Sequence, residues 1–140
     1  MKKKKSGIYD FFITLPDRLY PFAAVVDGKK VRGSKSYQKQ LERILEEYGV
    51  GKLGVKLMAY RQTCHFIGSI LFITCAALIS HLLYGSNDGL YLLLGAAIIA
   101  ITFQEFYLHP RTHGQGLKKG VLDWIAWTAP IALFIYITAF

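Results

Sequence analysis

Three long apolar stretches, separated by short polar connections, make up most of the second half of the chain. The first, residues 62–87, contains no formally charged side chain, and the two later stretches contain one each, Glu105 and Asp123. Each stretch can cross a hydrocarbon layer of roughly 30 Å as a helix that rises about 1.5 Å per residue. The pattern therefore predicts an all-α membrane protein. Its three transmembrane helices are expected at about residues 62–84, 89–108 and 121–140.

Before the first span, apolar residues recur at helical spacing beside a run of lysines. Ile8, Phe11, Phe12 and Leu15 fall on one face of a short helix that we expect Pro16 to stop. An aromatic face next to positive charge is typical of a segment that lies on an anionic membrane surface, and a disordered basic tail is the alternative. The residues predicted to anchor this segment to the membrane surface are Lys2, Lys3, Lys4, Lys5, Phe11 and Phe12.

The rest of the first 61 residues contains turn and helix signals. The dipeptide Asp27-Gly28, between two short runs that can extend, indicates a short β-hairpin at about residues 23–32. Residues 36–48 contain aromatic and aliphatic side chains at helical spacing. A second helical pattern at residues 52–61 is expected to continue into the first span.

The excess positive charge lies on one side of the first span. Residues 1–61 contain 14 Lys and Arg against 6 Asp and Glu, whereas residues 62–140 contain 3 of each. Because basic residues that flank spans stay in the cytoplasm, we predict a small basic amphipathic cytoplasmic segment (1–61) followed by a three-span bundle (62–140). The amino terminus is then cytoplasmic and the carboxyl terminus external, and we expect the inner membrane of a prokaryote. Since topology already accounts for the charge, we expect no nucleic-acid partner.

Four ionisable residues are predicted to lie at one depth in the membrane. If the spans are antiparallel, His65 begins the first, Glu105 and His109 end the second, and Asp123 begins the third. Glu105 and His109 are four residues apart and therefore share one helical face, which we expect to stop at Pro110. This is the one polar set in the sequence whose residues could bind a metal or carry out a reaction.

Such a set could hold a divalent metal that acts on a lipid head group or binds a substrate phosphate. The candidate metal ligands are Glu105, His109, His65 and His113, and the candidate catalytic residues are Glu105 and Asp123. Alternatively, Glu105 forms an ordinary ion pair at the membrane interface, with Lys118, Lys119 or Arg111 as its partner. Because the spacing matches no compact ligand motif, we predict no cofactor and keep the metal as the alternative hypothesis.

Small residues recur along the spans and predict close helix packing. The residues expected to serve it are Gly68, Ala96, Ala100, Thr128 and Ala132.

The outline of an amphipathic cytoplasmic start followed by three spans resembles that of the small prokaryotic diacylglycerol kinases. Their acidic, asparagine-containing signature around the second span is replaced here by residues 104–109, Gln-Glu-Phe-Tyr-Leu-His. The resemblance therefore implies a shared layout and transfers no activity.

In the absence of a catalytic motif, the sequence favours a non-enzymatic accessory or scaffolding subunit, and it leaves enzymatic activity open. Its expected partners are the lipid bilayer and either other membrane subunits or further copies of itself, since three short spans leave much apolar surface to cover. The alternatives are a metal-dependent or lipid-head-group enzyme at the cytoplasmic interface and an oligomeric transporter or pore. A pore would need several copies, because the spans contain almost no mid-membrane polar groups to line a pathway.

Overall fold

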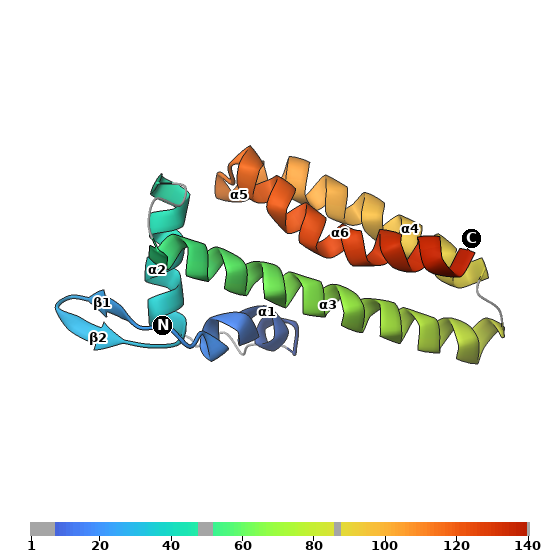
Figure 1. Ribbon diagram of the computed structural model, residues 1–140, viewed down its shortest axis with the longest axis horizontal. Helices are drawn as coiled ribbons and strands as arrows, with labels where there is room; N and C mark the ends of the chain where they lie inside the picture. Colours follow the sequence, from blue (N-terminus) through green and yellow to red (C-terminus); the bar gives the residue numbers. More distant parts are fainter. Residues whose placement is uncertain (1–7, 48–51, 86–87, 140) are drawn as a thin grey trace, which may run out of the picture. The chain divides into compact units, whose positions relative to one another are not determined.

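The structure is a computed structural model that describes residues 8–47, 52–85 and 88–139. Within these residues it is mostly helical, with one two-stranded sheet (Figure 1). It divides into an amino-terminal unit, residues 1–61, and a membrane unit, residues 62–140, which are described separately. In chain order the elements are α1 (Ile8–Leu19), β1 (Ala24–Val26), β2 (Lys29–Val31), α2 (Ser34–Glu47), α3 (Lys52–Tyr84), α4 (Asp88–Phe103), the π-helical turn η1 (Gln104–Leu108), α5 (His109–His113) and α6 (Leu117–Ala139).

Helix α1 does not stop at Pro16, so that expectation was wrong. The helix continues to Leu19 with the proline inside it. The φ angle of proline fits a helix. Its cost is one missing hydrogen bond and a steric clash of its ring with the preceding turn, and this cost matters less near a helix end. The Pro16 carbonyl, in the last turn, accepts a hydrogen bond of 2.8 Å from the hydroxyl of Tyr60. A side chain of α3 thus satisfies an acceptor that the end of α1 leaves open.

The hairpin predicted around residues 23–32 is confirmed. Strands β1 and β2 pair antiparallel, with Ala24 opposite Val31 and Val26 opposite Lys29. Asp27 and Gly28 both have positive φ, 50° and 73°, as a two-residue type I′ turn requires.

An aromatic cluster forms the core of the amino-terminal unit. Tyr20 is 2% exposed, packs edge-on against Tyr37 and donates a hydrogen bond of 2.5 Å from its hydroxyl to the side-chain oxygen of Gln40. Ile44 of α2 and Leu57 of α3 complete the buried set. The apolar stripe predicted for residues 36–48 therefore faces this core where it is described.

The prediction of three helices long enough to cross a membrane is confirmed, and each helix extends beyond its expected span. Their apolar parts are Gly54–Leu83, Gly89–Thr112 and Leu117–Ala139. Helix α3 is continuous from Lys52, because no breaker separates the pattern at residues 52–61 from the first apolar stretch.

The second helix continues past Pro110, contrary to expectation. In η1, just before the proline, the N–H of His109 bonds to the carbonyl of Gln104, five residues earlier. Pro110 then occupies the first turn of α5, where a missing N–H is tolerated. The wider π-turn lies between the α-helical hydrogen bonds of α4 and those of α5, so the chain stays helical to His113.

Two kinds of contact join the membrane helices. An apolar cluster contains Ile73 and Ala76 of α3, Leu90 and Leu94 of α4, and Ile131 of α6. Hydrogen bonds between the helices accompany it. Ser69 Oγ donates a hydrogen bond of 2.7 Å to the carbonyl of Trp127, and Trp124 Nε1 donates one of 2.9 Å to Thr102 Oγ1.

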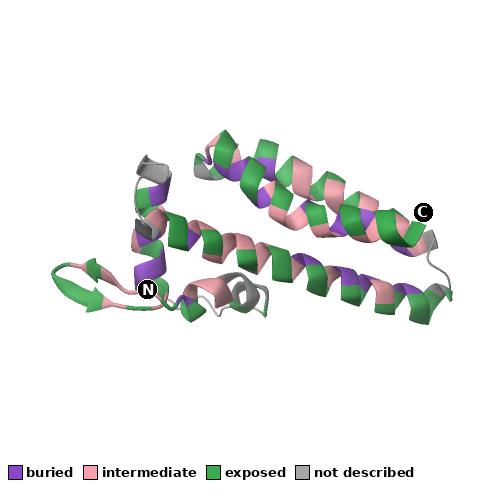
Figure 2. Ribbon diagram, viewed as in Figure 1, coloured by how far each residue is buried: buried purple, intermediate pink, exposed green. Residues whose placement is uncertain are grey.

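The predicted packing residues divide into two groups. Gly68 lies against the Trp127 ring so closely that an added Cβ would be 2.9 Å from it, and Thr128 is buried. Ala96, Ala100 and Ala132 are exposed. Figure 2 shows exposed residues recurring along α4 and α6. Within one chain, the small residues of α4 thus contribute less to helix packing than Gly68 does.

We predict that Gly28→Val loosens the hairpin, because a β-branched residue is strained at positive φ by about 1–2 kcal/mol. Amide hydrogen exchange of residues 24–31 in the full-length protein should accelerate roughly 5- to 30-fold. Gly28→Asn is the matched control, since asparagine tolerates this conformation, and it should exchange nearly as the parent does. Equal exchange in the valine and asparagine variants would contradict the turn assignment.

Candidate site: a polar network between the membrane helices

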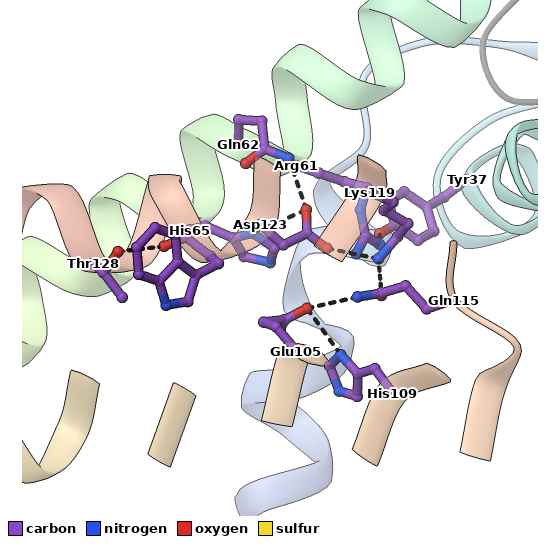
Figure 3. A network of polar contacts seen from close by, with 11 residues as sticks. Tyr37, Arg61, Gln62, His65, Glu105, His109, Gln115, Lys119, Asp123 and Thr128 are labelled. Carbon is purple, nitrogen blue, oxygen red and sulfur yellow. Dashed lines mark hydrogen bonds and ion pairs between the residues drawn. The ribbon is translucent and has the colours of Figure 1, made fainter. Parts of the chain in front are cut away.

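The structure brings His65, Glu105, His109 and Asp123 into one network of polar contacts (Figure 3). His65 comes from α3, Glu105 from η1, His109 from α5 and Asp123 from α6. The fifth candidate, His113, ends α5, but its side chain lies outside what the structure describes. All described members belong to the membrane unit.

Glu105 forms one end of the network. It is 3% exposed, and its Oε2 accepts a hydrogen bond of 2.7 Å from Gln115 Nε2 and lies 3.2 Å from His109 Nδ1. The i→i+5 hydrogen bonding of η1 widens the helical turn between the glutamate and the histidine, yet the two side chains still meet. The sequence spacing alone indicated this pair.

Asp123 forms the other end. It is 1% exposed, and its two oxygens have different partners. Oδ2 accepts 2.6 Å from Lys119 Nζ, while Oδ1 accepts 2.7 Å from Gln62 Nε2 and lies 3.6 Å from His65 Nδ1. Lys119 and Asp123 are one helical turn apart on α6, so they meet along the same face.

Gln115 and Lys119 connect the two carboxylates. The ammonium of Lys119 donates to Gln115 Oε1 as well as to Asp123, and the Gln115 amide nitrogen donates to Glu105. A continuous path of hydrogen bonds and ion pairs therefore runs from His109 to Gln62. Gln115 can serve both neighbours because its amide has a donor and an acceptor.

Two glycines shape the backbone around this path. Gly114 has φ of 62° and ends α5 in the left-handed conformation, which turns the chain toward α6. Gly120 is buried, and an added Cβ would lie 3.2 Å from both the Glu105 carbonyl oxygen and Gln115 Nε2. The missing side chain lets α6 approach η1 closely enough for Gln115 to reach the glutamate.

The burial of these groups explains why they are paired. A charge inside a membrane span costs several kcal/mol unless an opposite charge or hydrogen bonds compensate for it. Asp123 receives an ammonium and an amide, and Glu105 receives an amide and an imidazole. The network can therefore exist in a low-dielectric setting, and it connects four elements of the membrane unit, α3, η1, α5 and α6.

The candidate metal ligands separate into two pairs. Glu105 lies with His109, and His65 lies with Asp123, while Gln115 and Lys119 connect the pairs. Among the side chains that the structure describes, no group of three or more His, Cys, Asp or Glu could hold a metal ion.

Sequence reasoning missed Gln62, Gln115 and the part played by Lys119. Lys119 was considered as a partner of Glu105, but it pairs with Asp123. The i,i+4 spacing of Lys119 and Asp123 was a readable signal. Nothing in the sequence marked Gln115 as the link, because its role depends on the turn at Gly114.

In comparisons with known proteins, no family model, curated protein or solved structure matches this chain.

We predict that Lys119→Met destabilises the membrane unit by about 3–5 kcal/mol, because it leaves the Asp123 carboxylate buried without its cation. Unfolding in detergent micelles, followed by circular dichroism, measures the effect. The double variant Lys119→Met/Asp123→Leu removes both charges and should recover most of the loss. If the single variant is as stable as the parent, the ion pair does not hold the helices.

Proposed function

We propose that this chain is a small integral membrane accessory or scaffolding subunit, in which three spanning helices bind a partner and carry a basic surface unit. The main observation in support of this proposal is that the chain itself buries only a small part of each span. In the most apolar part of the three helices, only 22%, 17% and 28% of residues are buried. Lipid can cover the remainder, but so can the helices of another subunit.

The exposed face of α4 supports a protein partner. It combines the small residues Ala96 and Ala100 with the large residues Leu92, Ile99 and Phe103. In lipid, helices associate through close packing rather than through the hydrophobic effect, and small residues allow their backbones to approach. Gly68 serves such an approach inside the chain, whereas Ala96 and Ala100 are exposed.

The polar network supports the same role. Its carboxylates are supplied with donors from within the chain, as expected of a device that fixes the helices of a scaffold. The outward faces of the spans can then remain apolar.

We further propose that the amino-terminal unit lies on the cytoplasmic side of a prokaryotic inner membrane. The support is the charge distribution, with 14 of 17 basic residues before residue 62. Ile8 and Phe11 of α1 are exposed, and the Arg18 guanidinium lies over the Phe11 ring, so an apolar and a basic group occur side by side. This combination suits a helix that lies on an anionic leaflet. The lysines at positions 2–5 and the Phe12 side chain, expected to add to this anchor, lie outside the described residues.

The orientation predicts the outcome of reporter fusions. Alkaline phosphatase fused after Phe140 or after Gly85 should be active, because both points are expected outside the cytoplasm. Fusion after Gly114 is the internal control and should be inactive. Activity after Gly114 together with inactivity after Phe140 would reverse the proposed orientation.

We predict that Ala96→Phe disrupts association, because the ring keeps another helix from approaching α4. The parent chain, extracted from its native membrane into lipid nanodiscs, should carry a membrane partner or a second copy at a fixed ratio, measured by native mass spectrometry. The variant should lose at least tenfold in association. Leu71→Phe, which adds bulk at an exposed α3 position, is the matched control and should retain the partner. A monodisperse monomer of the parent chain would contradict the scaffolding role.

A further inference from the structure

A cavity of about 270 Å³ lies among the helices of the membrane unit, next to the glutamate of the polar network. Four elements contribute to it, namely α3, α4, η1 and α6. Most of its wall is apolar, and one end carries two polar side chains. The lining residues are Phe72, Ala97, Ala100, Ile101, Gln104, Glu105 and Trp127.

The charges of the network favour a cation at that polar end. Its described members are two carboxylates, one ammonium, two imidazoles and two amides. The Asp123 carboxylate has the Lys119 ammonium as a partner. Glu105 has an amide and an imidazole beside it and pairs with no Lys or Arg among the described residues, so it is the carboxylate at which a further cation is favoured.

The geometry at Glu105 leaves room for one more donor. Both contacts that the described residues make to this side chain, from Gln115 and His109, fall on Oε2. A carboxylate can accept several hydrogen bonds through its two oxygens, and this one also lines the cavity. Gln104 also lines the cavity, and its side-chain amide has an oxygen that can accept a hydrogen bond.

We propose that the cavity binds an amphiphilic organic amine. The protonated amino group pairs with Glu105 and Gln104, and the apolar body lies between Phe72 and Trp127, whose rings attract a cation as well as an alkyl chain. Cavities for drug-sized ligands hold about 300–1,000 Å³, so the part of the ligand inside this one is small. Ala100 belongs both to this cavity and to the α4 face proposed for a partner, but amine binding is measured on the purified chain, so either proposal can fail without the other.

The amine could be a free compound dissolved in the bilayer or the ammonium of an aminophospholipid head group. Both present the same chemistry to Glu105. The test below therefore includes an arm that distinguishes them.

Bromine quenches tryptophan fluorescence on contact, and Trp127 lines the cavity, so 8-bromo-octylamine is a suitable probe. The full chain with Trp124→Phe, which leaves Trp127 as its one tryptophan, is reconstituted in phosphatidylcholine liposomes. We expect saturable quenching by the amine and at least tenfold weaker quenching by 8-bromo-octanol, which has the same chain without the charge. If added phosphatidylethanolamine competes with the probe, the natural ligand is the lipid. If it does not compete, the natural ligand is a free amine.

Two variants test the two halves of the site. Glu105→Gln removes the charge, and Ala97→Leu fills the cavity while the carboxylate remains; each should weaken amine binding at least tenfold. Ala132→Leu adds the same bulk at an exposed position of α6 and should bind as the parent does. Circular dichroism and gel filtration verify the fold, and if Glu105→Gln does not fold, Ala97→Leu and the comparison of amine with alcohol decide. No saturable quenching, equal quenching by the alcohol, or unchanged binding in either folded variant would overturn the proposal.

Discussion

The buried ion pair between Lys119 and Asp123 is the interaction on which the membrane unit depends most. Both side chains are nearly inaccessible, and in such a setting neither charge is tolerable alone. The pair also does more than neutralise itself. The ammonium holds Gln115, which holds Glu105, and the aspartate holds Gln62. One cation therefore fixes the relative positions of α6, η1 and the start of the membrane-embedded part of α3.

This constraint explains several features that look unrelated in the sequence. A side chain at Gly120 would crowd the Glu105 carbonyl of η1, because an added Cβ would lie 3.2 Å from that oxygen. The turn at Gly114 must place Gln115 between two helices. The remaining surface is then free to be apolar, since both carboxylates of the network have donors inside the unit. A bundle with polar contacts inside and apolar faces outside follows from these requirements.

Much of the architecture could be predicted because it depends on local signals. Hydropathy located the three long helices, Asp27-Gly28 located the hairpin, and helical spacing located the Glu105–His109 pair. The errors concern proline. Pro16 was expected to end a helix but lies inside its last turn, and Pro110 was expected to end another, but a π-turn precedes it. The π-turn is a hydrogen-bond pattern that single-residue propensities do not contain, and the importance of Gln115 likewise appears only once the helices are placed.

The π-turn has a consequence for how this protein can diverge. It contains one residue more than an α-helical turn would, and each residue rotates an α-helix by about 100°. Loss of a single residue between Gln104 and Leu108 would restore a regular helix and turn Glu105 away from the groups that follow it. Descendants of a common ancestor could therefore keep all the polar residues described here and still lack the connection among them, through one deletion at a site that touches neither lysine nor aspartate.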